Sequence, residues 1–140
     1  TICFCSHVDT SPDVTGAGLD PWRDNIRALS RLPNLNAKIS GIVAYSGADW
    51  TVETIRPYIE HVIECFGWDR VVWGSDHPVV TLTGSLTRWV EATREVIRGT
   101  SEEEQAKLLH LNARRIYKSR PLLYLGKTRQ VTHPCLRPDV

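Results

Sequence analysis

Residues 71–78 read Val71-Val72-Trp73-Gly74-Ser75-Asp76-His77-Pro78. Three apolar, strand-favouring residues are followed by a glycine, and then by a carboxylate, an imidazole and a proline. This pattern is typical of a buried strand that ends in a loop. Parallel α/β proteins carry their reactive groups at such carboxyl ends of strands. Asp76 is therefore the first candidate for a functional residue.

Two further strands are expected upstream. The β-prone run 2–8 ends at His7, and a second run covers 35–42. The second run alternates, so that its polar residues share one face; these are Asn36, Lys38 and Ser40. A strand covered by helices on both faces is normally apolar on both. The polar face therefore predicts a cavity or the interior of a barrel.

Helical periodicity separates the strands. Helices are expected over 20–32, 57–66, 84–99 and 102–118, with a short helical turn over 51–55. Asp20 is expected as the first N-cap, Pro57 at the start of the second helix, and Ser101 with Glu104 as a capping box. The apolar stripes place Leu32 and Leu86 inward, whereas His61 is expected at the surface or its boundary.

The resulting order, β-α-β-α-β-α-α, predicts parallel strands joined by right-handed crossovers. Three strands cannot close a barrel, which needs eight. Residues 119–140 contain three prolines and no periodic pattern, so an irregular tail is expected there, with one short strand over 122–125.

The amino-acid composition excludes several classes of function. The chain has 140 residues, of which 41% are hydrophobic and 24% charged, and this fits one globular domain. A net charge of +1 gives no basic excess for nucleic acid or an anionic membrane. The sequence shows no membrane-spanning run and no secretory signal. Four cysteines without metal-knuckle spacing favour a reduced, cytoplasmic setting. The chain lacks methionine and opens within a strand, which predicts a piece of a longer protein.

Each strand end offers a chemical group with two interpretations. Asp76 could ligate a metal ion or act as a general base on water, or it could cap its loop. His7 could be a metal ligand or proton shuttle, or it could make a local hydrogen bond. Lys38 could hold an anionic substrate, or its stem could lie along the wall while the ammonium reaches water.

Other candidates are weaker. Ser40 shares the polar face of the second strand, and His77 lines the same mouth or shapes the turn. Trp50 is either a core residue or a pocket wall. Cys3, Cys5 and His7 share one strand face, but their different depths favour two apolar filler cysteines over a zinc site.

Three motifs carry a resemblance to a known family. Residues 32–41, Leu32-Pro33-Asn34-Leu35-Asn36-Ala37-Lys38-Ile39-Ser40-Gly41, are similar to a signature of the amidohydrolase-related family of metal-dependent TIM-barrel hydrolases. Residues 66–79 and 112–117 resemble its second hallmark and its C-terminal helix. The chain looks most like the branch that contains fuconolactonase-like and pyrone-dicarboxylate lactonases. The resemblance runs from about residue 2 to residue 118.

This resemblance implies an α/β fold: the C-terminal portion, about three βα units, of a (β/α)8 TIM barrel that is incomplete in this chain. It implies a partial barrel domain over 1–118 and an irregular tail over 119–140. The implied activity is hydrolysis of a small-molecule lactone, expected to be anionic, by water that Asp76 activates. A divalent metal ion is implied, with zinc expected and His7 and Asp76 as ligands, although metal dependence varies among these lactonases. The implied substrate-binding residues are His7, Lys38, Ser40, His77 and Trp50.

The sequence departs from the family at three points. Ser6 stands where the family usually has Asp, and His77 where it usually has Trp. The His-x-His pair of the family's first strand does not occur in these residues. The isolated chain is therefore expected to be inactive and to self-associate through open sheet edges. The alternatives are a metal-dependent decarboxylase of the same superfamily and a non-catalytic fragment or interaction module.

Overall fold

A computed structural model describes residues 2–5 and 20–117. Its strands are β1 (Ile2–Cys5), β2 (Leu35–Ile39) and β3 (Val71–Trp73). Its α-helices are α1 (Asp20–Ser30), α2 (Val52–Phe66), α3 (Leu86–Val96), α4 (Glu102–Ala106) and α5 (Asn112–Ile116). Two 3-10 helices, η1 (Val43–Tyr45) and η2 (Val79–Leu82), and one π-helical segment, η3 (Lys107–Leu111), complete the described elements.

The described strands form one parallel sheet in the order β1-β2-β3. Ile2 lies opposite Leu35, and Lys38 lies opposite both Cys5 and Val72. The predicted α/β order and the parallel pairing are confirmed. Because the chain crosses over after each strand, the carboxyl ends of all three strands meet at one edge of the sheet.

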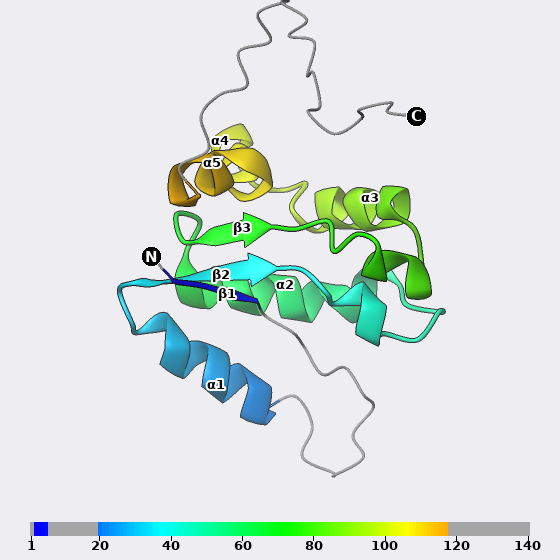
Figure 1. Ribbon diagram of the computed structural model, residues 1–140, viewed down its shortest axis with the longest axis horizontal. Coiled ribbons are helices and arrows are strands. Elements are labelled where there is room, and N and C mark those ends of the chain that lie inside the picture. The colour runs from blue at the N-terminus through cyan, green and yellow to red at the C-terminus, as the bar shows by residue number, and fades with distance from the viewer. Residues whose placement is uncertain (1, 6–19, 118–140) are drawn as a thin grey trace, which may run out of the picture.

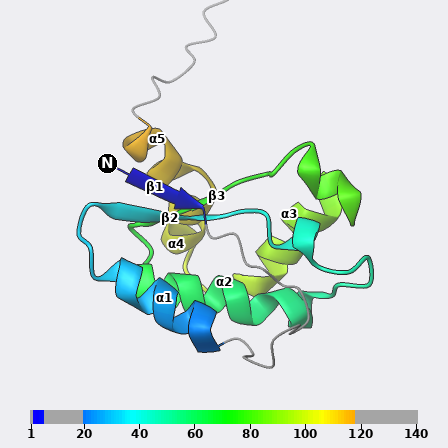
Figure 2. The same ribbon diagram turned by 60° about the horizontal axis from the view of Figure 1, so that its bottom comes forward.

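Helices α1 and α2 form a layer against the sheet, and the last helical stretch packs along β3 (Figures 1 and 2). Alternate residues of the strands point into this layer, including Ala37, Ile39 and Val71, which are fully buried. Trp89 of α3 is also fully buried and stacks on Trp73, with ring centroids 5.9 Å apart. The core therefore lies on the helical side of the sheet.

The expected separation of a short turn over 51–55 from a helix over 57–66 was wrong, because α2 is continuous. It is one helix that begins after Thr51, whose side chain accepts from the backbone of Thr54 while the Thr54 hydroxyl accepts from the Thr51 N–H. This reciprocal cap starts the helix five residues earlier than the proline suggested. Pro57 lies inside the helix, where it removes one backbone donor without ending the helix.

Other boundaries also differ from the expected ones. Helix α1 ends at Ser30 rather than at residue 32, and α3 covers Leu86–Val96 rather than 84–99. Strand β2 ends at Ile39 rather than at residue 42, because Gly41 adopts a φ of 81°, which extended backbone cannot continue. The last helix is divided by a π-helical segment, and its described part ends at Ile116. The capping box of Ser101 and Glu104 is confirmed.

Three side chains lie elsewhere than expected. Leu32 and Leu86 are 48% and 39% exposed, because each lies at or beyond a helix end, where the apolar stripe leaves the core. His61 is only 7% exposed, because α1 packs over it: its Nε2 lies 3.1 Å from the Arg23 carbonyl oxygen and its ring 5.5 Å from that of Trp22.

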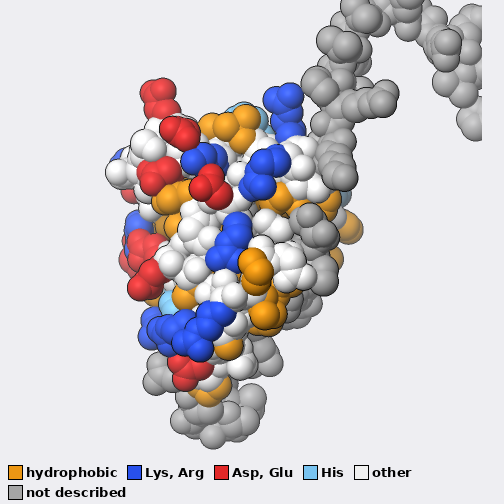
Figure 3. Space-filling view, turned by 90° about the vertical axis from the view of Figure 1, so that its left-hand side faces the viewer, with side chains coloured by type: hydrophobic (Ala, Val, Ile, Leu, Met, Phe, Trp, Pro, Cys, Tyr) orange, Lys and Arg blue, Asp and Glu red, His pale blue; other side chains and the backbone are white. Residues whose placement is uncertain are grey.

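Several predictions lie outside the described residues. They concern His7, the loop that follows it, the tail over 119–140, and the side chains of Cys3 and Cys5. None of the described helices is long and apolar enough to cross a membrane. On the face shown in Figure 3, acidic and basic side chains are interspersed, in keeping with the near-zero net charge.

Candidate functional site

Asp76 lies three residues beyond the end of β3, at the edge of the sheet where the strands end. It has a φ of 54°, a left-handed conformation that aspartate tolerates better than most residues and that turns the chain sharply after the strand. Its Oδ1 accepts a hydrogen bond from the Ser40 hydroxyl at 3.4 Å. Its Oδ2 is buried and has no hydrogen-bond partner among the described residues. Buried polar atoms are nearly always hydrogen-bonded, so an oxygen in this state can mark a catalytic or ligand-binding position.

Ser40 directly follows β2 and is 1% exposed. It continues the alternation of Asn36 and Lys38, so all three belong to the face of the sheet away from the α1–α2 layer. Asn36 is also buried, at 7% exposure. The polar face predicted from the sequence is therefore present and is not an exposed surface.

Lys38 reaches across the neighbouring strand. A Cβ built on Gly74 would meet the Lys38 Cε at 2.4 Å and the Ser40 Cβ at 3.1 Å. The aliphatic stem of Lys38 therefore lies over the backbone of Gly74, two residues before Asp76. The structure brings together Lys38, Ser40 and Asp76, the three described side chains that the sequence placed at neighbouring strand ends.

His77 and Trp50 make their hydrogen bonds to residues outside this group. His77 is exposed, and its backbone N–H donates to the Ser75 hydroxyl at 3.4 Å. Trp50 is 3% exposed, and its indole N–H donates to the Thr83 carbonyl. The Arg88 guanidinium lies 3.8 Å from the centroid of the Trp50 ring. These contacts favour the core interpretation of Trp50, and its role in binding substrate stays a prediction.

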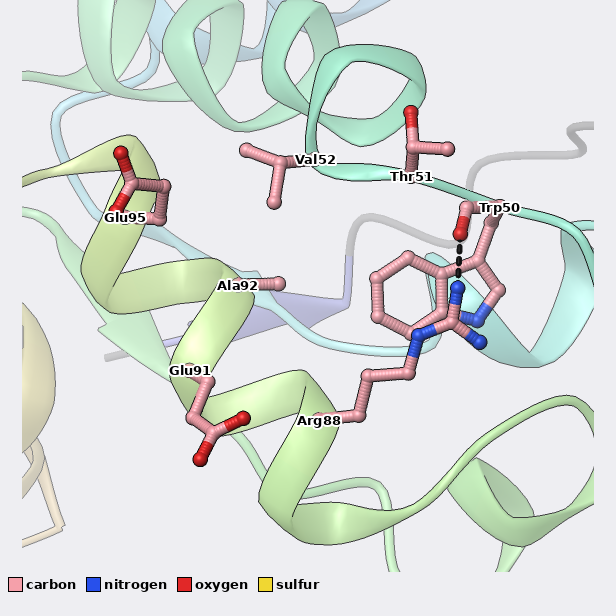
Figure 4. A pocket seen from close by; sticks show the side chains of 7 residues that line it. All are labelled: Trp50, Thr51, Val52, Arg88, Glu91, Ala92 and Glu95. Carbon is pink, nitrogen blue, oxygen red and sulfur yellow. Dashed lines mark hydrogen bonds between the residues drawn. The ribbon is translucent and has the colours of Figure 1, made fainter.

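A concave region adjoins Trp50. It is a groove of about 390 Å³ between the start of α2 and α3, lined by Trp50, Thr51, Val52, Arg88, Glu91, Ala92 and Glu95 (Figure 4). Arg88 spans it by donating to the Trp50 carbonyl. The groove is lined mainly by helical side chains of the outer layer, not by the polar face that carries Lys38.

The described residues supply one candidate metal donor at the site, the Asp76 carboxylate. Its buried Oδ2 has the chemistry of a ligand for a divalent cation. No group of three His, Cys, Asp or Glu side chains within the described residues could hold a metal ion. His7, the other predicted ligand, lies outside them. The described part of the chain therefore does not by itself fit a complete metal site.

Gly74 is the residue of this site that the sequence reasoning missed. A glycine at the end of an apolar strand often marks a close approach of another group, and this signal was present in the sequence. What it could not reveal was the approaching group, because that depends on the register between β2 and β3.

The sequence profile of the Amidohydrolase family (Amidohydro_2) matches residues 9–118. An uncharacterized protein, y4mH of Sinorhizobium fredii, is 37% identical over 97 residues, which are 69% of this chain and 32% of that protein. The L-fucono-1,5-lactonase of Burkholderia ambifaria is 32% identical over 52% of this chain and 25% of its own length. The L-fucono-1,5-lactonase of Burkholderia multivorans is 32% identical over 57% of this chain and 31% of its own length. The chain thus spans a third or less of the length of these relatives.

Solved amidohydrolase structures also match part of this chain. A crystal structure of an amidohydrolase from Burkholderia multivorans with bound zinc matches 73% of this chain and 38% of its own, with a TM-score of 0.69 and 26% identity. Amidohydrolase 2 from Bifidobacterium longum subsp. infantis matches 86% of this chain and 40% of its own, with a TM-score of 0.59 and 22% identity. The described sheet and helices are therefore similar to one part of larger amidohydrolase structures.

Proposed function

Because this chain belongs to the Amidohydrolase family, we propose that it supplies part of the active site of a lactone hydrolase in which Asp76 activates the attacking water. The observation that carries the proposal is the Asp76 carboxylate, held by Ser40 at one oxygen and left without a partner at the other. Relatives named L-fucono-1,5-lactonase support lactones as the substrate class.

The chemical step follows from this asymmetry. Oδ2 of Asp76 takes a proton from water, and the water oxygen attacks the carbonyl carbon of the lactone. The bond between that carbon and the ring oxygen then breaks, and the ring oxygen leaves with the proton that Asp76 took up. The product is a hydroxy acid. The hydrogen bond from Ser40 to Oδ1 keeps Oδ2 directed at the water throughout.

The position of Lys38 favours a substrate that carries a negative charge. Its stem lies over Gly74 on the polar face, so its positive charge belongs to the same face as Asp76. A lysine ammonium is a compact cation suited to a carboxylate. We therefore propose that Lys38 binds the negatively charged group of the substrate. His7 and His77 remain proposed substrate contacts. His7 is also a proposed metal ligand together with Asp76. A divalent ion held by these two residues would polarise the lactone carbonyl.

The whole active site requires more chain than is described here. The three parallel strands match part of larger amidohydrolase structures, and we propose that they are three βα units of a (β/α)8 barrel. In the sheet order, β1 and β3 are edge strands whose outer backbone groups would pair with the neighbouring barrel strands. The isolated chain is then inactive and self-associates. Sedimentation velocity over a range of concentrations tests this, and a stable monomer would contradict it.

A hybrid barrel tests the proposed function. The segment of the Burkholderia multivorans L-fucono-1,5-lactonase that aligns with this chain is replaced by residues 2–117. A folded hybrid, verified by its melting transition, is assayed with neutral and carboxylated lactones. We expect hydrolysis that Asp76→Asn reduces at least about 100-fold, because general-base catalysis contributes about that much. Asp69→Asn, which changes an exposed carboxylate outside the site, is the matched control. A folded hybrid without turnover, or an Asp76→Asn hybrid with full turnover, would sink the proposal.

A further inference from the structure

We propose that Gly74 is a positioning residue, because the space left by its missing Cβ is what allows Lys38 and Ser40 to lie beside Asp76. The inference rests on the proposed function and extends it to a residue that carries no reactive group. The juxtaposition is specific: one added carbon at Gly74 would meet both Lys38 and Ser40, and the Ser40 hydroxyl donates to the Asp76 carboxylate.

The backbone of Gly74 is fixed on both sides. Its N–H donates to the Ile39 carbonyl of β2 at 3.0 Å, and its own carbonyl accepts from the Trp89 indole at 3.0 Å. Trp89 is fully buried in the core. The strand therefore cannot move away to make room for a side chain at this position.

The glycine is required for space rather than for its backbone conformation. The φ of Gly74 lies outside the positive range that disfavours other residues. Gly67 is the opposite case, since its φ is 70° and a Cβ there would meet nothing within 4 Å. Replacing Gly74 by alanine is thus a test of contact alone, free of backbone strain.

The two neighbours would respond differently to an added methyl group. The Lys38 Cε, at 2.4 Å, belongs to the far end of a flexible side chain and can swing aside. The Ser40 Cβ and Oγ, at 3.1 and 3.3 Å, are much closer to ordinary contact and need to give by only a few tenths of an ångström. Alanine at position 74 would therefore displace the Lys38 ammonium first and leave the bond between Ser40 and Asp76 largely intact. The predicted consequence is a misplaced positive charge beside a working carboxylate.

The first measurement is a double-mutant cycle on stability, using the chain as it is. Gly74→Ala should lower the urea midpoint of unfolding, and the loss should be smaller in a Lys38→Ala background, where the displaced atom is absent. Gly99→Ala is the matched control, because a Cβ there would meet nothing within 4 Å. Equal losses in both backgrounds would overturn the inference.

The second measurement follows Lys38 directly. Lysines are labelled as their ¹³C-dimethyl forms, which keep the charge, and the Lys38 signal is assigned by its absence in Lys38→Arg. In the parent chain, we expect Asp76→Asn to shift the Lys38 signal. Gly74→Ala should itself shift the Lys38 signal and abolish this effect of Asp76→Asn, while the Lys107 signal stays in place. A Lys38 signal that is the same in Gly74→Ala and Gly99→Ala would contradict the proposal.

Kinetics separate positioning from a purely structural role. In the hybrid barrel, Gly74→Ala should raise KM for a carboxylated lactone and leave kcat and the KM for a neutral lactone near the parent values. An equal loss for both substrates would overturn the positioning role. If Asp76→Asn leaves turnover unchanged while the cycle and the Lys38 signal behave as expected, the proposed function fails and the contact at Gly74 stands.

Discussion

The hydroxyl of Ser40 donates to Oδ1 of Asp76 at 3.4 Å, joining the ends of two neighbouring strands that are 36 residues apart in the chain. Ser40 is 1% exposed, so this hydrogen bond is made away from bulk water. The contact gives the two carboxylate oxygens different surroundings. We therefore propose that Ser40 acts through Asp76, while its contact with the substrate, which the family resemblance implied, stays a prediction.

Ser40→Ala should reduce kcat about fivefold in the hybrid barrel and leave KM nearly unchanged, because one hydrogen bond of about 1 kcal/mol no longer orients the carboxylate. Steady-state kinetics measure both constants. Ser30→Ala is the control, since that serine bonds the Arg27 carbonyl on an exposed helix end. A raised KM with an unchanged kcat would return Ser40 to the role of substrate contact.

Arg70→Ala should lower the free energy of unfolding by about 2 kcal/mol, because charged donors to carbonyls are worth more than neutral ones. Arg70 lies just before β3 and donates to the carbonyls of Ser30, Leu32 and Phe66. Its guanidinium also lies 5.2 Å from the centroid of the Phe66 ring. Urea unfolding measures the loss, and exposed Arg31→Ala serves as the control. Since Arg70 lies at the opposite end of β3 from Asp76, the folded hybrid should keep its kcat.

Asn112→Ala should cost about 2–3 kcal/mol of stability, because it leaves buried carbonyls without a donor. The Asn112 amide donates to the carbonyls of Trp68 at 2.6 Å and Val71 at 2.8 Å, and its residue is 3% exposed. Thermal unfolding measures the effect, with exposed Asn34→Ala alongside. A change as small as that of Asn34→Ala would show that this link between α5 and β3 is dispensable.

Burial raises the pKa of the Cys65 thiol; of the smaller contributions, the charge of Arg27 lowers this pKa and that of Glu64 raises it. The folded chain then holds the thiol proton more tightly than the unfolded chain does. The stability that this provides is complete below the ordinary thiol pKa of about 8.5 and is lost as the pH rises through the raised value. Cys65→Ala should remove that part of the alkaline loss. Urea midpoints between about pH 7 and 10 measure it, and equal pH profiles for both proteins would refute it.

The sequence by itself determined the order of strands and helices and the parallel sheet. Val71, Val72 and Trp73 predict a strand through their own preferences, and Ser101 with Glu104 caps a helix through contacts three residues apart. The sequence also identified Lys38, Ser40 and Asp76 as groups at strand ends, because alternation along a strand is a local property.

Only the tertiary structure decided what those groups touch. The contact between Ser40 and Asp76, the passage of Lys38 over Gly74 and the burial of His61 depend on register and on helix packing. Each of these is set by residues more than 30 positions apart in the chain. Local preferences fix the direction in which a side chain leaves its own strand or helix. The distance to a partner on another element is fixed only when the core closes and the strands settle into one register.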